Sequence, residues 1–345
     1  MRNKPSVIIT GAAGFIGSAL AERFIKANYK VIGIDNINDY YDINLKKSRL
    51  KRIEEVSKNI NGYWEFNRIS IEDIKALEGV FKGINDEIIL INLAAQAGVR
   101  YSIDNPEVYM QSNLIGFGNI LEISRKYNVC NLIYASSSSV YGGNTNYPYK
   151  ETHPVNHPVS FYAATKKSNE LMAHSYSNLY GINATGLRYF TVYGPWGRPD
   201  MAPMIFANSI TKNKPINIYN NGLMRRDFTF IDDIVEATYL CALKKATINT
   251  KFDSNNPDQA TSFSPHRIFN IGAGNSIELL YFIELLEKAF GTKAIKKFLP
   301  MQKGDVLNTA ADINLLKNWV NYKPQIKVED GVKKFVNWYK TYFDV

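Results

Sequence analysis

Two residues that could transfer a proton stand four positions apart. Tyr162 and Lys166 lie in the segment FYAATKKS, and on a predicted helix this spacing places both on one face. A tyrosine ordinarily keeps its proton up to a pKa of about 10, and a neighbouring lysine ammonium favours the phenolate. The pair could therefore act as a general base near neutral pH. Spacing alone is equally typical of two residues on an exposed helix face.

A cluster of hydroxyl groups precedes this pair. Ser136–Ser139 end the apolar run NLIYASS, which predicts a buried strand. Ligands of a doubly wound parallel sheet bind at the carboxyl ends of its strands. Ser137 is therefore a candidate to hydrogen-bond and orient the hydroxyl group that Tyr162 would deprotonate, although four serines can also simply end a strand.

A glycine-rich turn suggests where a nucleotide cofactor would bind. In VIITGAAGFIGSAL, Gly11, Gly14 and Gly17 follow a predicted strand and open a predicted helix. Such glycines permit a tight turn, and the helix N-terminus offers N–H groups to a pyrophosphate. The next strand, VIGID, ends at Asp35. A carboxylate there can accept hydrogen bonds from ribose hydroxyls and would repel a 2′-phosphate, which favours NAD over NADP.

The stretch RYFTVYGPWGRPDM, residues 188–201, combines aromatic residues with glycine, proline and Arg198. Glycine and proline disfavour a helix, so the pattern predicts the end of a buried strand and then a stiff loop. This loop presents Arg198 to a ligand, or else is a structural turn with an exposed arginine.

The elements that must position these residues alternate regularly. Apolar runs at 6–10, 29–35, 87–94, 131–137 and 184–190 predict strands, with amphipathic stretches at 16–28, 108–128 and 162–181 among them. This indicates an α/β fold, a Rossmann-type doubly wound parallel sheet. After about residue 188 the pattern is irregular. We expect a dinucleotide-binding domain over 1–188, rejoined by a segment near 228–272, and a smaller C-terminal α/β substrate-binding lobe mainly over 189–345.

Composition excludes several other classes of protein. The net charge is +9, but the lysines of NLKKSRLKRIEEVSK and of the stretch after Lys288 are interpreted as solvated helix faces, so no nucleic-acid partner is expected. No apolar run is long enough to span a membrane, and no signal peptide precedes PSVIITGAAG. Two cysteines and four scattered histidines predict neither a disulfide nor a metal site. The same cysteine usage predicts a cytoplasmic location.

The motifs TGAAGFIG and LAAQAG (93–98) resemble the extended, nucleotide-sugar-modifying branch of the short-chain dehydrogenase/reductase superfamily. The resemblance implies that Ser137, Tyr162 and Lys166 form the catalytic group. It also implies one departure, since the family usually has an aspartate that bonds the adenine amine where Ser70 stands. The residues that the resemblance places along NAD are Gly11, Gly14, Phe15, Ile16, Gly17, Asp35, Ser70, Ile71, Leu93, Ala94, Ala95, Asn113, Tyr162 and Lys166.

The loop RYFTVYGPWGRPDM resembles the signature of UDP-glucuronate 4-epimerases, in which the positions matching Thr191 and Arg198 contact the sugar carboxylate. Ser138 and Ser139, two further candidates for substrate binding, stand where 4,6-dehydratases have an Asp–Glu pair, so the elimination of water is not expected. The segments GLMRRDFTFIDD and PMQKGDVLNTAAD resemble the family's nucleotide-binding segments, which implies Arg226 at the pyrophosphate and Gln302 and Asp305 near the uridine ribose.

The resemblance thus implies an NAD-dependent 4-epimerase that interconverts UDP-glucuronate and UDP-galacturonate, with Tyr162 as the base. It also implies a homodimer paired through helices over 105–127 and 162–180. A UDP-galactose or UDP-N-acetylhexosamine 4-epimerase and a UDP-glucuronate decarboxylase are alternatives within the same fold. A non-catalytic NAD-sensing protein is an alternative of another class, against which the intact Ser137, Tyr162 and Lys166 argue.

Overall fold

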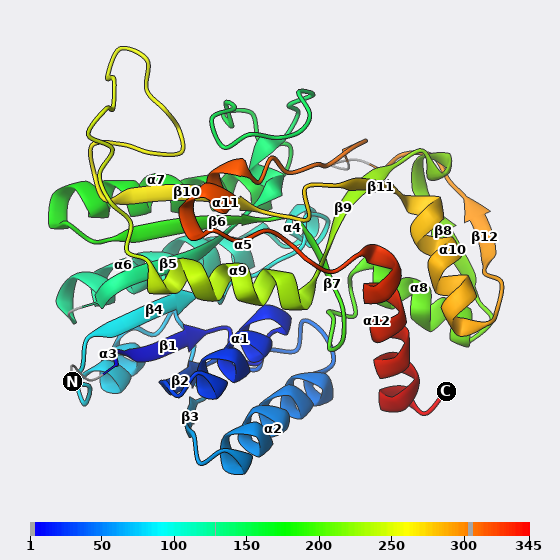
Figure 1. Ribbon diagram of the computed structural model, residues 1–345, viewed down its shortest axis with the longest axis horizontal. Helices are drawn as coiled ribbons and strands as arrows, with labels where there is room; N and C mark the ends of the chain where they lie inside the picture. Colours follow the sequence, from blue (N-terminus) through cyan, green and yellow to red (C-terminus); the bar gives the residue numbers. More distant parts are fainter. Residues whose placement is uncertain (1–3, 128, 303–305) are drawn as a thin grey trace.

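A parallel sheet of seven strands forms the centre of the molecule in the computed structural model, which describes residues 4–127, 129–302 and 306–345 (Figure 1). Its strand order is β10-β6-β5-β4-β1-β2-β3. The strands are β1 (Ser6–Thr10), β2 (Lys30–Ile34), β3 (Tyr63–Asn67), β4 (Ile88–Asn92), β5 (Val129–Ser137), β6 (Ala184–Tyr189) and β10 (His266–Ile271). This confirms the predicted α/β class with a doubly wound parallel sheet.

Helices cover both faces of the sheet, which is why its central strands are apolar throughout. On β1, Val7 and Ile9 pack with residues of α1 and α9, whereas Ile8 packs with residues of α3 and α6. One face carries α1 (Phe15–Lys26), α2 (Ile43–Asn59), α9 (Ile231–Leu243) and α11 (Asn314–Val320), and the other carries α3 (Ile74–Phe81), α6 (Phe117–Lys126) and α7 (Phe161–Tyr180).

The helix expected over 108–128 is interrupted, and residue 128 lies outside the described residues. Short helices α4 (Tyr101–Asp104) and α5 (Pro106–Tyr109) lead into a π-helical turn, η1 (Met110–Gly116), before α6 begins. Within this turn the Asn113 carbonyl accepts a hydrogen bond from Asn169 Nδ2 at 2.6 Å, a contact with α7 that lies outside the regular helix ladder. Turns of this kind are frequent near functional sites.

The second lobe lies beside the carboxyl ends of β1, β5 and β6, to the right of the large sheet in Figure 1. A three-stranded sheet in the order β11-β9-β7 and a two-stranded sheet of β12 and β8 pack against helices. Its elements are β7 (Thr191–Tyr193), α8 (Ala202–Thr211), β8 (Pro215–Ile218), η3 (Tyr219–Gly222), β9 (Arg225–Phe230), β11 (Ser276–Glu278), α10 (Leu279–Phe290), β12 (Ile295–Phe298) and α12 (Val328–Phe343).

The chain passes from the lobe back to the large sheet. β9 belongs to the small sheet, but α9 then packs against α1, and β10 pairs with β6 from His266↔Ala184 to Ile271↔Tyr189. The two parts therefore share one hydrophobic core. Among the described residues, no helix is both long and apolar enough to cross a bilayer.

Candidate functional site

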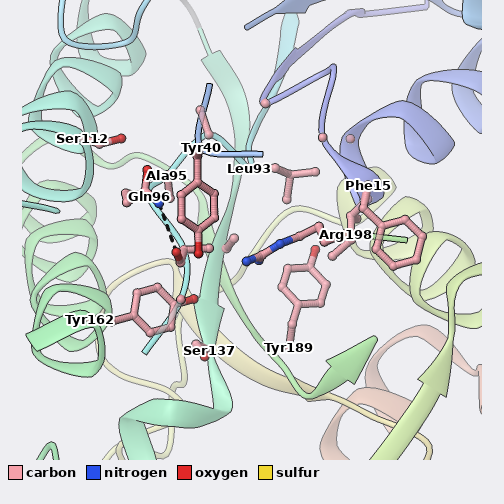
Figure 2. Close-up of a pocket in the computed structure, with 18 of the residues that line it drawn as sticks. Phe15, Tyr40, Leu93, Ala95, Gln96, Ser112, Ser137, Tyr162, Tyr189 and Arg198 are labelled. Atoms are coloured by element: carbon pink, nitrogen blue, oxygen red, sulfur yellow. Dashed lines mark hydrogen bonds between the residues drawn. The ribbon is translucent and has the colours of Figure 1, made fainter. Parts of the chain in front are cut away.

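One large cavity lies where the carboxyl ends of the parallel strands meet the second lobe (Figure 2). Its volume is about 370 Å³. Most residues around it lie at or just beyond the ends of β1–β6, and others lie on α1, α2, η1, α7, β7 and the loop after β7. The cavity brings together these predicted site residues: Gly11, Gly14, Phe15, Ile16, Gly17, Asp35, Ser70, Ile71, Leu93, Ala94, Ala95, Ser137, Ser138, Ser139, Tyr162, Lys166, Thr191 and Arg198.

The turn from β1 to α1 fits a pyrophosphate. Gly11 has a φ of +72°, and a Cβ added there would lie 2.8 Å from the backbone nitrogen of Ala94. A Cβ at Gly17 would lie 2.1 Å from the Gly11 carbonyl oxygen, so the turn is close-packed and tolerates no side chain. Helix α1 follows Gly14 with no side-chain cap and no acidic residue in its first turn. Its first N–H groups are therefore suited to an anionic ligand in the cavity.

Asp35 stands at the end of β2 and faces the same turn. Its Oδ2 accepts a hydrogen bond from the Ala13 N–H at 3.0 Å, and its Oδ1 accepts one from the Ile37 N–H at 2.8 Å. Burial raises the pKa of this carboxyl, while the two backbone N–H groups and the nearby Lys46 act against the rise. Each oxygen retains a lone pair, so the carboxylate can also accept from a ribose hydroxyl.

Ser70 has a carboxylate partner of its own. Its hydroxyl donates to Glu72 Oε2 at 2.5 Å. Because a carboxylate only accepts, the Ser70 oxygen keeps its lone pairs for a donor in the cavity. An amine could bond there, in the role that the family's aspartate suggests for this position.

Tyr162 and Ser137 both line the cavity. Figure 2 shows the Tyr162 hydroxyl directed into the same space as Ser137 and the Arg198 guanidinium. Burial raises the pKa of Tyr162, whereas hydrogen bonding with Ser137 and the positive charge of Arg198 lower it. A further positive charge near the Tyr162 oxygen would favour release of its proton.

Lys166 lies one helical turn beyond Tyr162 and is buried. Its Nζ donates to the Ala135 carbonyl oxygen at 2.9 Å, and burial lowers its pKa to about 8. No carboxylate pairs with its ammonium among the described residues. The lysine is thus close to a change of charge near neutral pH, and its positive form is available to a phenolate or a ribose in the cavity.

A buried ion pair fixes the helix that carries Tyr162. Glu170, on α7, accepts hydrogen bonds from Arg188 Nε at 2.8 Å and Arg188 Nη2 at 2.9 Å. It also accepts one from the Ser136 hydroxyl at 2.7 Å. These contacts join α7 to β5 and β6. They therefore fix the helix that carries Tyr162 against the strand that ends at Ser137.

Asn113, which the resemblance places along the cofactor, does not line the cavity, and its contact with NAD stays a prediction. It is 1% exposed, and its Oδ1 accepts from the Gln96 N–H at 2.8 Å. Its Nδ2 donates to the Gln96 carbonyl at 3.0 Å and to Thr165 Oγ1 at 3.0 Å. Both ends of the amide are therefore in use, and Asn113 positions the loop that bears Gln96 against α7.

Arg198 enters the cavity already paired on one edge. Its Nε and Nη2 donate to the two oxygens of Asp200 at 3.1 and 2.5 Å, and the Tyr40 hydroxyl donates to Asp200 Oδ2 at 3.1 Å. Burial lowers the pKa of Arg198, but the Asp200 carboxylate outweighs burial and raises it. A guanidinium carries five N–H donors, so N–H groups beyond the two that bind Asp200 can donate to a ligand carboxylate; Thr191, on β7, lines the same cavity.

Arg226 and Gln302, two of the three residues expected to bind the nucleotide portion of the substrate, do not line this cavity. Arg226, on β9, does not line the cavity, and its Nη1 donates to the carbonyls of Arg225 at 2.9 Å and Leu307 at 3.2 Å. Gln302 has a buried Oε1 with no hydrogen-bond partner among the described residues. Asp305 lies outside the described residues.

Sequence reasoning missed a group of polar residues in the loop after β2 and on α2. Tyr40 and Lys46 line the cavity, and Lys46 and Arg49 are buried, so the interpretation of this helix as a solvated basic face is wrong for these two. The available signal was their spacing: Lys46 stands four positions before the buried Leu50, and Arg49 four positions before the buried Ile53, on the apolar side of the helix.

The arrangement defines a class of enzyme. A glycine-rich turn, an aspartate after β2 and a Ser–Tyr–Lys group around one cavity are suited to dinucleotide-dependent oxidation at a hydroxyl carbon. Among the described residues that line the cavity, Asp35 is the one carboxylate, so a carboxylic acid–base pair for the elimination of water is absent from that lining.

Comparison with known proteins agrees with this class of enzyme. Residues 7–272 match the NAD dependent epimerase/dehydratase family, and the chain belongs to it. It is 49% identical to Protein CapI of Staphylococcus aureus, over 98% of this chain and 99% of that protein. It is 44% identical to a probable UDP-glucuronate 4-epimerase of Rhizobium meliloti (strain 1021), over 96% of each. The crystal structure of UDP-glucuronic acid 4-epimerase from Bacillus cereus with UDP-glucuronic acid and NAD matches with a TM-score of 0.83 and 31% identity, over 98% of this chain and 99% of that one.

Proposed function

We propose that this protein is an NAD-dependent 4-epimerase that interconverts UDP-glucuronate and UDP-galacturonate. The observation that carries the proposal is Arg198, which lines the same cavity as Tyr162 and Ser137 and is held there by Asp200 through Nε and Nη2. A guanidinium there can bind a sugar carboxylate next to the reacting hydroxyl. The relatives that are named UDP-glucuronate 4-epimerases support this choice of substrate.

NAD, when bound, supplies a hydride acceptor and donor for the sugar carbon C4. The turn at Gly11, Gly14 and Gly17 would hold its pyrophosphate, and Asp35 a ribose. The rest of the chemistry belongs to the side chains. Tyr162 removes the proton of the 4-hydroxyl as C4 becomes a ketone, and it returns the proton when the ketone is reduced again. Ser137 orients that oxygen, and the Lys166 ammonium favours the phenolate.

Arg198 and Thr191 also protect the ketone. A 4-keto-uronate is a β-keto acid, and it loses carbon dioxide when the bond to its carboxylate aligns with the carbonyl π system. Binding of the carboxylate in another orientation disfavours this loss. Because the hydride must return to the other face of C4, the sugar has to rotate, and the carboxylate contact must tolerate that rotation. For the nucleotide portion we propose Arg226, Gln302 and Asp305, with Ser138 and Ser139 at the sugar.

Incubation of the purified protein with UDP-glucuronate, followed by separation of the products, tests the proposal. We expect UDP-galacturonate and no net change in NAD. A UDP-pentose with carbon dioxide as the main product would instead establish a decarboxylase. Conversion of UDP-glucose or UDP-N-acetylglucosamine at a rate equal to that of UDP-glucuronate would overturn the choice of a uronate. The absence of any conversion would favour a protein that only senses NAD.

We also propose that the protein is a cytoplasmic homodimer. On η1 and α7 several large apolar side chains are exposed, among them Ile115 at 50%, Leu171 at 60% and Leu179 at 64%. These helices lie together on one face of the sheet (Figure 1). Burial of such a surface against a second copy would remove it from water. Cys130 and Cys241 are both free thiols, which is compatible with a reducing compartment.

A further inference from the structure

We infer that Arg49 is a positioning residue that couples the cofactor turn to the loop that presents Arg198. The inference rests on the proposed function, since it assigns to Arg49 the preference for a sugar carboxylate. Arg49 belongs to α2, lies outside the cavity lining and would touch neither cofactor nor substrate. Its effect must therefore pass through the segments that it contacts.

The guanidinium of Arg49 is buried among backbone carbonyl groups. It is 1% exposed, and its Nε and Nη2 donate to the Trp196 carbonyl oxygen at 3.1 and 2.7 Å. Nη2 also donates to the Gly197 carbonyl oxygen at 3.2 Å. Arginine is rarely buried without a carboxylate partner, and none is in contact with Arg49 among the described residues. The surroundings of Arg49 thus suit several N–H donors in fixed directions, and the described residues around it form no ion pair with it.

The loop needs such a fork at this point. Trp196 has a φ of +66°, a left-handed conformation that is uncommon for any residue other than glycine. Its ring packs against Trp338 and Tyr342, with centroids 5.4 and 4.9 Å away, while Arg49 holds its carbonyl. Arg198 follows two residues later. Arg49 therefore fixes the direction in which the chain leaves Trp196, and with it the place of the Arg198 guanidinium.

The other end of the same guanidinium reaches the cofactor side. Nη1 donates to the Ala13 carbonyl oxygen at 3.0 Å and to the Tyr41 hydroxyl at 2.7 Å. Ala13 lies between Gly11 and Gly14, and its N–H donates to Asp35. One side chain thus joins the glycine turn, the segment after Asp35 and the carboxylate loop. A ligand that holds the glycine turn in place also holds, through Arg49, the loop that carries Arg198. NAD and the uronate should therefore strengthen each other's binding.

Arg52 provides a matched control on the same helix. It lies over the ring of Trp196, with 5.4 Å from Cζ to the ring centroid, and pairs with Glu22 at 2.8 Å. It makes none of the carbonyl contacts of Arg49 and does not line the cavity. Replacement of Arg52 removes one positive charge near Trp196, while the carbonyl groups of the loop keep their hydrogen bonds from Arg49.

The test compares Arg49→Lys, which keeps the charge but loses the fork, with Arg52→Met and the unaltered protein. Titration calorimetry measures the binding of UDP-glucuronate and UDP-glucose to each NAD-loaded protein. The rate of NAD release is measured with and without UDP-glucuronate. For Arg49→Lys we expect at least about tenfold weaker binding of UDP-glucuronate, little change for UDP-glucose, and loss of the slowing of NAD release by UDP-glucuronate. Arg52→Met should match the unaltered protein.

The outcomes separate this inference from the proposed function. If the unaltered protein binds both sugars equally, this inference fails, whereas the proposed function fails only if UDP-glucose is also converted as fast as UDP-glucuronate. If the unaltered protein discriminates and Arg49→Lys discriminates equally well, or loses affinity for both sugars alike, only this inference fails. Should Arg49→Lys not fold, Tyr41→Phe removes one acceptor of Arg49 and should lower the same selectivity to a smaller extent. Unchanged selectivity in that variant would overturn the inference.

Discussion

At the scale of single residues, Tyr162 is the group whose oxygen titrates in the reaction. Tyr162→Phe keeps the ring and its edge contact with Tyr109 but removes that oxygen. We expect turnover to fall by at least about a hundredfold, while NAD binding measured by calorimetry stays within about twofold. Tyr176→Phe, on the same helix but outside the cavity, should leave turnover unchanged. Near-normal turnover in Tyr162→Phe would exclude this residue as the base.

Arg198 determines, on our proposal, both the binding and the fate of the uronate. Arg198→Ala removes a charge-assisted contact of about 1.5–3 kcal/mol, so UDP-glucuronate should be used roughly 10- to 100-fold less efficiently. The loosely held ketone should also release some UDP-pentose and carbon dioxide. Thr191→Ala should act in the same direction more weakly. Product analysis with UDP-glucuronate and UDP-glucose measures both effects.

Asp200 complicates that experiment and also supplies its control. In Arg198→Ala the Asp200 carboxylate loses its guanidinium and would repel the substrate carboxylate. The double variant Arg198→Ala/Asp200→Asn removes this repulsion and isolates the loss of the contact itself. If the double variant slows both sugars equally and yields no extra pentose, the loop is only structural and the choice of glucuronate loses its main support.

At the scale of elements, the end of β2 determines which dinucleotide fits the turn between β1 and α1. Asp35 should repel a 2′-phosphate, so NAD should bind more tightly than NADP, and Asp35→Ala should narrow the gap. Asp39→Ala removes the same charge from the exposed part of the same segment and should leave the preference intact. Calorimetry with NAD and with NADP measures the two affinities and hence this preference. Equal affinities in the unaltered protein would contradict the assignment.

At the scale of the whole molecule, the exposed apolar surface on η1 and α7 predicts self-association. Leu171→Asp/Leu179→Asp places two charges on that surface and should convert the dimer to a monomer in size-exclusion chromatography with light scattering. Leu243→Asp, at the end of α9 on the other face of the sheet, should remain dimeric. A monomeric unaltered protein, or a dimer that persists in the double variant, would contradict the proposed pairing.

The sequence by itself determined the features that are set by local interactions. Glycine spacing after an apolar strand predicted the β1–α1 turn, because only glycine tolerates the close contacts at Gly11 and Gly17. Strand and helix periods predicted the order of most elements and the parallel sheet. The sequence likewise predicted the serines at the end of β5, and Tyr162 and Lys166 one turn apart on a helix. The structure brings these residues to one cavity.

Tertiary structure decided what depends on contacts between distant segments. The half-exposed edge strand β3 lacks a clear apolar pattern, since solvent covers part of it. Burial of Lys46 and Arg49 could not be predicted from their charge, because the acceptors of Arg49 include the carbonyl groups of Trp196 and Gly197, about 150 positions later in the chain. Asn113 lies behind the cavity wall because Gln96 and Thr165 use its amide. Local spacing specifies turns and helix faces, but the partners of a buried polar group are fixed only when the chain has folded around it.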